Sequence, residues 1–146
     1  MRLAADASTL VAEGMRARGR RLFAHPHLDL VVAADAWSET EHELRKRVAL
    51  LVERRHLGAT DATELFDEIL AAVTAHVTPV TDEVYAHNLE AAYRRIPRNQ
   101  RDVPTVALAL TLDCGIWTAD YDFFGCGVPV WVTDTLQAHL EAHDDR

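Results

Sequence analysis

The most constraining feature of the sequence is an apolar helical stretch followed at once by an apolar strand that ends on acids. The helix is predicted over Val103–Cys114, immediately after Asp102 in the sequence. Pro104 in its first turn strengthens that prediction. The strand is predicted over Ile116–Thr118, and Asp120 and Asp122 follow it. A helix that returns into a short strand in this way is typical of α/β folds.

A second strand end of the same kind lies near the N-terminus, where the apolar segment Arg2–Ala5 ends on Asp6. The carboxyl ends of parallel strands line one edge of an α/β sheet, and ligands collect at that edge. We therefore expect Asp6 to share a pocket with the acids of the C-terminal half. Crowded carboxylates need protons or a cation, and oxygen-only ligation favours Mg²⁺ or Mn²⁺ over zinc. Such a metal site supports phosphodiester hydrolysis.

Strands and helices are predicted to alternate over the whole chain. This alternation predicts one domain over residues 1–146, a three-layer α/β/α sandwich with a central, mainly parallel sheet. The predicted strands are Arg2–Ala5, Leu28–Ala34, His76–Val80, Ile116–Thr118 and residues 130–132; the main predicted helices run from Ser8 or Thr9 to about Arg18, from Ala36 to about His56, from Thr60 or Asp61 past Val73, from Thr81 to Tyr93, over Val103–Cys114, and from Asp134 to His143.

The composition excludes a disordered or a membrane-spanning chain. Hydrophobic residues make up 49% of the sequence and charged residues 26%, and no apolar run approaches the roughly 20 residues that a membrane span needs. The N-terminus also lacks the pattern of a secretory signal. We expect a cytoplasmic protein with no membrane contact.

The formal net charge of −8 weighs against a nucleic-acid partner, because affinity for phosphate comes from lysine and arginine. The basic residues are clustered, however, and arginine suits phosphate well. One cluster runs from Arg94 to Arg101 and leads directly into Asp102. We therefore predict that Arg98 and Arg101 contact the substrate.

Taken together, these residues resemble the PIN-domain ribonucleases, and most of all the small single-domain prokaryotic type that includes the VapC toxins. The resemblance rests on four motifs in this order and extends from Arg2 to about Leu136. They are Asp6-x-Ser8, an acid early in the first long helix, Asp102 ahead of Ala-Leu-Ala-Leu, and Ile116-Trp117-Thr118-x-Asp120-x-Asp122-Phe123. The last two motifs are the more specific.

The resemblance implies a PIN-like, Rossmann-like fold and a metal-dependent endoribonuclease that cleaves RNA with a metal-activated water, leaving 3′-hydroxyl and 5′-phosphate ends. It assigns catalysis to Asp6, Glu39, Asp102 and Asp120. It also implies that Asp6, Asp102, Asp120 and Asp122 hold one or two Mg²⁺ or Mn²⁺ ions. Ser8 and Thr118 are expected to hydrogen-bond the acids or a phosphate.

Three glutamates compete for the place of the helical acid. Glu39 lies in the first turn beyond the strand end and is the first choice by position. Glu43 shares its helix face and is followed by Leu44, which fits the family pattern better. Glu41 lies closer to the apolar stripe and ranks third. The alternative for Asp122 is a turn residue.

Several functional alternatives stay open at this point. A VapC-like toxin implies a small antitoxin that blocks the acidic groove, and homodimers are common among such domains. The chain can instead be a housekeeping nuclease, or an inactive PIN-like module that binds RNA or protein. A phosphatase with Asp6 as the nucleophile is disfavoured, because Ser8 stands where that mechanism needs a second aspartate.

Overall fold

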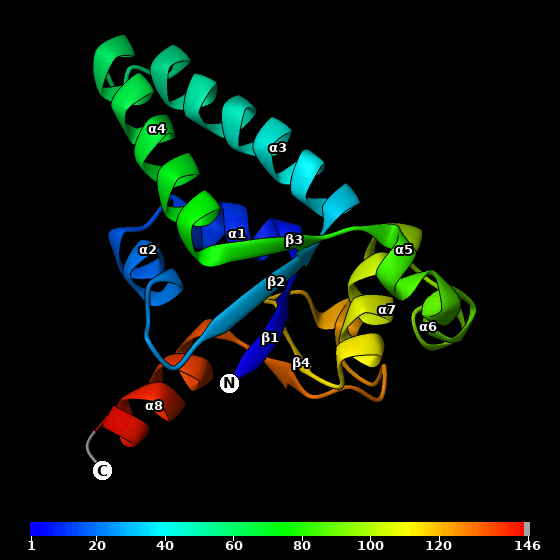
Figure 1. Ribbon diagram of the computed structural model, residues 1–146. Helices are drawn as coiled ribbons and strands as arrows, with labels where there is room; N and C mark the ends of the chain where they lie inside the picture. The colour runs from blue at the N-terminus through cyan, green and yellow to red at the C-terminus, as the bar shows by residue number, and fades with distance from the viewer. Residues whose placement is uncertain (145–146) are drawn as a thin grey trace.

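The computed structural model describes residues 1–144 and shows a five-stranded sheet in the order β3-β2-β1-β4-β5 (Figure 1). All four strand pairs are parallel, so the predicted α/β sandwich is confirmed and its sheet is entirely parallel. The two final residues of the domain predicted over 1–146 lie outside the described part. The strands are β1 (Arg2–Ala5), β2 (Asp29–Ala33), β3 (Val77–Val80), β4 (Gly115–Trp117) and β5 (Val130–Trp131).

Helices cover both faces of the sheet. The first four helices pack together on one face, and α3 and α4 form a hairpin that projects from the sheet, whereas α5, α6 and α7 pack on the other face (Figure 1). The helices are α1 (Ala7–Gly14), α2 (Ala17–Phe23), α3 (Ala34–Glu53), α4 (Ala59–His76), α5 (Asp82–Tyr85), α6 (Leu89–Arg95), α7 (Val103–Leu112) and α8 (Thr133–Asp144), with 3₁₀ turns η1 (Ala86–Asn88), η2 (Gln100–Asp102) and η3 (Tyr121–Phe123).

The central strand β1 ends in two small residues, although alanine is not favoured in strands. Ala4 and Ala5 are fully buried between β2 and β4, and α7 packs against this strand. Small side chains allow the apolar helix α7, with its buried Val106 and Leu108, to approach the sheet closely. Burial on both sides therefore overrides the weak local preference of the strand.

The first helical segment differs from the prediction. The sequence predicted a helix from Ser8 or Thr9 to about Arg18 and a second helical turn over Arg20–Ala24, whereas α1 runs from Ala7 to Gly14 and α2 begins already at Ala17. The close approach of the two helices depends on Gly19, because a Cβ atom there would lie 2.1 Å from the carbonyl oxygen of Glu13. The position of the break is thus a packing effect that helix propensity does not reveal.

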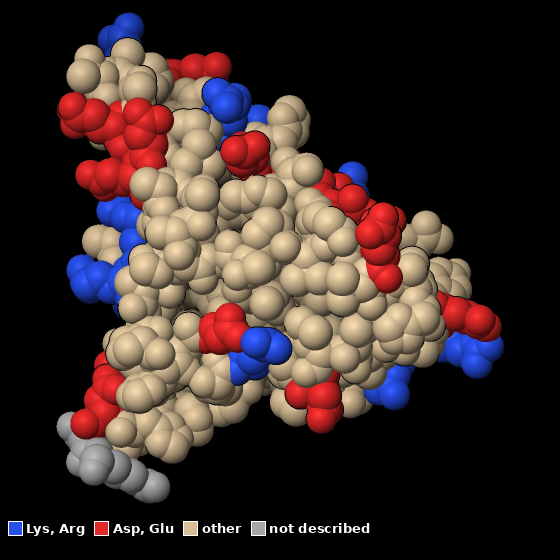
Figure 2. Space-filling model, in the orientation of Figure 1, with Lys and Arg blue, Asp and Glu red and all other residues tan. Residues whose placement is uncertain are grey.

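Charged side chains are dispersed over the face of the molecule shown in Figure 2. Lysine and arginine lie mainly near its margins, interspersed with aspartate and glutamate, and much of the centre is uncharged. This face therefore offers no continuous basic field for a nucleic acid. Within residues 1–144, none of the helices has both the length and the apolar character that a membrane crossing requires.

Candidate active site at the carboxyl edge of the sheet

The candidate site lies at the point where the strand order reverses, which in open α/β sheets is the usual place for a ligand. β1 has β2 on one side and β4 on the other, and Ala5 pairs with Trp117 at the carboxyl end. The backbone N–H of Asp6 donates to the carbonyl of Trp117 over 3.0 Å. The sheet therefore brings Asp6 beside the segment that carries Asp120, although the two lie 114 positions apart in the sequence.

Two hydroxyl groups hold the buried carboxylate of Asp6. Its Oδ2 atom accepts hydrogen bonds from Ser8 Oγ and from Thr118 Oγ1, the latter over 3.1 Å. Thr118 is fully buried, and its hydroxyl oxygen also accepts the backbone N–H of Asp120 over 3.0 Å. Thr118 thus links the carboxylate of Asp6 to the backbone at Asp120. Ser8 is exposed and lines a surface groove.

Asp102 presents a buried carboxylate oxygen that is left without a partner. The residue is 8% exposed at the junction of η2 and α7, and among the described residues Asp102 Oδ2 has no hydrogen-bond partner. Its side chain makes no capping bond to α7 within that same part of the chain. A buried polar atom of this kind is costly, and it calls for a ligand, a proton or an ion. The Asp102 carboxylate therefore does not serve as a cap of α7.

Asp102, Asp120 and Asp122 form one cluster. Each offers a carboxylate oxygen, and these oxygens all lie within 4.8 Å of one another. Asp120 also accepts the backbone N–H of Asp122 through Oδ1 over 2.9 Å, so the turn that follows β4 orients both acids. Asp122 is exposed, whereas Asp120 is half-buried.

The crowding changes the titration of Asp102. Burial, as the largest cause, and the charges of Asp6, Asp120 and Asp122 together raise its pKa from 3.8 to about 7, and a hydrogen bond with the Asn99 side chain acts in the opposite direction. The ionised cluster is therefore unfavourable without a counter-charge. A donor set made only of carboxylate oxygens, one of them buried and unpartnered, fits a hard divalent cation such as Mg²⁺ or Mn²⁺.

A groove of about 520 Å³ opens over Asp6, Asp102 and Asp120 and is lined by several predicted site residues. Glu39 and Glu43 both line it, so the structure leaves two candidates for the helical acid. Glu41 instead lines a small apolar hollow beside Trp37. The polar and charged side chains around the groove are Asp6, Ser8, Glu39, Thr40, His42, Glu43, Lys46, Arg47, Asn99, Arg101, Asp102, Thr105 and Asp120.

The two predicted substrate arginines differ in position. Arg101 lines the groove, whereas Arg98 is exposed and is not among the lining residues. Sequence analysis did not select Lys46 and Arg47, which line the groove from α3. The signal was present, because these residues follow Glu43 by three and four positions and therefore share its helix face.

A second hollow of about 330 Å³ adjoins the groove and shares Ser8, Arg47 and Asp120 with it. It adds Arg16 and the buried Glu13. The two hollows therefore meet beside Asp120.

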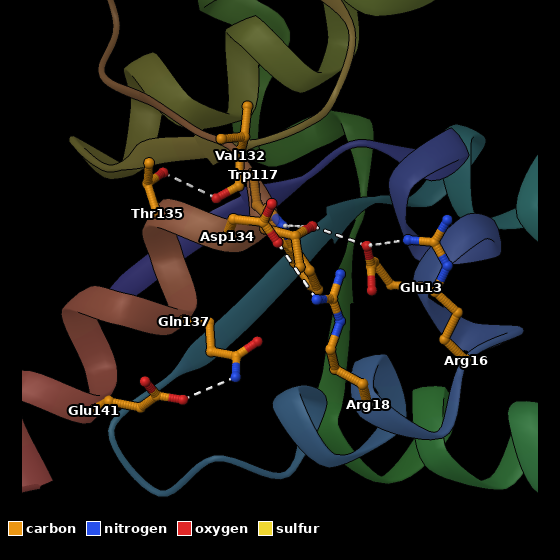
Figure 3. A network of polar contacts seen from close by, with 10 residues as sticks. Glu13, Arg16, Arg18, Trp117, Val132, Asp134, Thr135, Gln137 and Glu141 are labelled. Carbon is orange, nitrogen blue, oxygen red and sulfur yellow. Dashed lines mark hydrogen bonds and ion pairs between the residues drawn. The ribbon is translucent and has the colours of Figure 1, made fainter.

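A buried polar network supports the wall of this second hollow (Figure 3). Glu13 Oε1 accepts the hydroxyl of Thr133 over 2.9 Å and the guanidinium of Arg16 over 3.3 Å. The indole Nε1 of Trp117 donates to Thr133 Oγ1 over 3.2 Å. The network joins α1, the end of β4 and the start of α8, and it holds Arg16 at the rim.

A parallel α/β sheet with crowded aspartates at its switch point, in a groove that also carries lysine and arginine, is typical of nucleases that use divalent metal ions. The comparison with known families agrees with this class. The chain matches the PIN domain family model over residues 5–141, and it belongs to that family. PIN domains are nucleases as a class and usually use divalent metals. No curated protein shows a significant match to the chain.

Proposed function

We propose that this protein is a metal-dependent endoribonuclease that hydrolyses RNA phosphodiester bonds. The observation that carries the proposal is the unpartnered, buried Oδ2 atom of Asp102, which lies in a cluster with Asp120 and Asp122. Family membership supports a nuclease, and the basic residues that line the groove support a polyanionic substrate.

In this proposal Asp6, Asp102 and Asp120, with Asp122, hold one or two Mg²⁺ or Mn²⁺ ions. A divalent ion in such a site supplies water of lowered pKa and stabilises negative charge on a phosphoryl group. Thr118 keeps Asp6 in place relative to Asp120, because its hydroxyl bonds both of them. Cleavage is proposed to leave 3′-hydroxyl and 5′-phosphate ends.

The cationic residues of the groove position the RNA backbone. Lys46, Arg47 and Arg101 line the groove and are exposed, so they can contact phosphates without a large desolvation cost. Together with a divalent ion held by the aspartates, these cations would offset the five carboxylates that line the groove, so that phosphate can approach despite the net charge of −8. Glu39 or Glu43 supplies a further carboxylate from α3, for the metal or for its water.

The test combines Mn²⁺ titration by calorimetry with single-stranded RNA cleavage in the same buffer. We expect wild type to bind Mn²⁺ and to cleave, Asp6→Asn and Asp120→Asn to lose cleavage while they remain folded, and EDTA to stop the reaction. Glu141→Gln, on the exposed part of α8, is the matched control and keeps full activity. Unchanged cleavage in both aspartate variants would sink the proposal, and folded wild type without Mn²⁺ binding would indicate a binding module.

Glu39→Gln and Glu43→Gln decide which helical acid acts. Because both side chains line the groove, the fold alone does not rank them. We expect Glu39→Gln to reduce kcat/KM by about 100-fold or more, as loss of a directly acting carboxylate does. Glu43→Gln is then expected to stay within a few-fold of wild type. The reverse order would transfer the role to Glu43.

A VapC-type role, with a small antitoxin that occupies the acidic groove and presents an arginine to the carboxylates, is a further part of the proposal. So are a homodimer and a cytoplasmic location. Growth arrest on expression, with rescue by the product of an adjacent gene, tests the toxin role. Sedimentation analysis tests the dimer. A chain that is harmless when expressed and monomeric at micromolar concentration would point to a housekeeping nuclease.

A further inference from the structure

An exposed pair of aromatic rings lies in the turn after β4 that carries Asp120 and Asp122. Tyr121 is 79% exposed and Phe124 is 48% exposed, and Tyr121 is the most exposed large hydrophobic side chain in the described part of the molecule. Their ring centroids are 5.2 Å apart with an interplanar angle of 79°. Exposure of this size costs free energy in water, and core packing does not explain it.

The turn holds these rings outward. Phe123 is fully buried and anchors the turn, while Asp120 Oδ1 accepts the backbone N–H of Asp122 over 2.9 Å. The backbone N–H of Phe124 donates to the carbonyl of Tyr121 over 3.0 Å. Gly125 follows with a φ of +86°, a conformation that favours glycine and turns the chain away. The aromatic pair is thus presented on a braced segment.

Its position relative to the acids suggests what it contacts. Tyr121 is the residue between Asp120 and Asp122, and both have carboxylate oxygens within 4.8 Å of an oxygen of Asp102. Consecutive Cα atoms are about 3.8 Å apart, so the tyrosine ring begins next to the cluster. When a phosphate lies at the acids, the base of an adjoining nucleotide comes within reach of this ring.

We propose that Tyr121 and Phe124 form a stacking platform for a base of single-stranded RNA beside the scissile phosphate. The inference rests on the proposed nuclease function and narrows its substrate class. An edge-to-face pair leaves ring surface open for a base, and aromatic stacking is the usual way proteins hold unpaired bases. The bases of a duplex already stack on their neighbours and cannot splay onto the platform.

A protein partner fits this surface less well. Two rings provide little area compared with the roughly 800 Å² per partner of a stable protein interface. The carboxylates of Asp120 and Asp122 flank the rings, and they would be buried unpaired under an apolar partner surface. An RNA base instead arrives together with the phosphate and cation that neutralise those acids.

The test compares Tyr121→Ala with Tyr121→Phe, and it uses Tyr93→Ala as the control, since Tyr93 is 46% exposed on α6. The probe is a single-stranded RNA oligonucleotide that carries 2-aminopurine, mixed with protein and Mg²⁺ in a stopped-flow fluorimeter so that binding is seen before cleavage. A self-complementary duplex of the same length is run in parallel. Circular dichroism checks that each variant is folded.

We expect Tyr121→Ala to weaken single-strand binding by about 5- to 150-fold and to abolish 2-aminopurine quenching. KM should rise while kcat stays within about twofold, because stacking holds the substrate and its transition state equally. Tyr121→Phe should keep binding and quenching, since it retains the ring. Tyr93→Ala should match wild type, and the duplex should bind weakly to every variant.

The outcomes separate this inference from the proposed function. Cleavage in wild type with unchanged binding and quenching in Tyr121→Ala would overturn the platform and leave the nuclease standing. Tyrosine-dependent binding without cleavage would support the platform and overturn the nuclease. Preference for duplex RNA, no RNA binding by wild type, or loss of self-association in place of RNA affinity in Tyr121→Ala would each overturn the platform.

Discussion

Replacing Asp102 by asparagine should stabilise the metal-free protein above neutral pH. The folded protein raises the pKa of Asp102 from 3.8 to about 7, first through burial and then through the charges of Asp6, Asp120 and Asp122. Asparagine has nearly the shape of a protonated carboxyl group but carries no charge. The variant therefore keeps the packing and removes the electrostatic cost.

The sign follows from proton linkage. Between pH 4 and 7 folded Asp102 binds a proton that the unfolded chain has already released, so this group makes stability fall as the pH rises through that range. With the folded pKa at about 7, ionisation of Asp102 lowers the unfolding free energy by roughly 2 to 3 kcal/mol between pH 5 and pH 8. Solvent in the open groove reduces this figure. For a chain of this length it corresponds to about 4 to 10 °C in Tm.

The assay is urea or thermal unfolding of wild type and Asp102→Asn in EDTA at pH 5, 6, 7 and 8. The quantity to compare is the difference between the two proteins, because histidines and other groups titrate in both and cancel. We expect the unfolding free energy of the variant, relative to that of wild type, to increase as the pH rises. We also expect Mn²⁺ to stabilise wild type much more than the variant at pH 8. A difference that stays constant from pH 5 to 8 would refute the electrostatic account of the cluster.

The remaining predictions concern the network, the packing and the substrate. Thr133→Val should lower the unfolding free energy by about 1 to 3 kcal/mol in urea titrations, because the Trp117 indole and Glu13 lose their shared partner; equal stability would show that water replaces it. Gly19→Ala should destabilise strongly, since its Cβ would lie 2.1 Å from a backbone oxygen, whereas the control Gly58→Ala, whose Cβ meets its nearest atom at 3.5 Å, should stay near wild type; similar melting curves would contradict this. Arg101→Ala should weaken RNA binding and lower the salt slope by about one, and an unchanged slope would place Arg101 outside the phosphate path.

Local sequence carried the elements that position the site. Short apolar segments that end on acids predicted the strand ends at Asp6 and Asp120, because strand and helix patterns depend on near neighbours. The helix after Asp102 was likewise predictable from the sequence, since Pro104 and an apolar run mark a helix start. The parallel sheet followed from the alternation of these elements. The family pattern predicted which acids to examine.

Tertiary structure decided how those side chains meet. Asp102, Asp120 and Asp122 converge within 4.8 Å, and Thr118 bridges Asp6 to the chain at Asp120, through the pairing of β1 with β4. A strand pattern states which residues are buried but not which strand lies alongside, since that choice depends on packing between distant segments.

The walls of the groove also depend on the fold. Helix periodicity places Glu39, Glu43, Lys46 and Arg47 on one face, but only the angle at which α3 leaves the sheet turns that face toward the acids. The 79% exposure of Tyr121 likewise cannot be read from the sequence, because it depends on how the turn after β4 is packed. The sequence by itself determined the elements and the acids at their ends, because local interactions specify them. The structure determined which charges share one cavity, because burial and repulsion act between residues far apart in the chain.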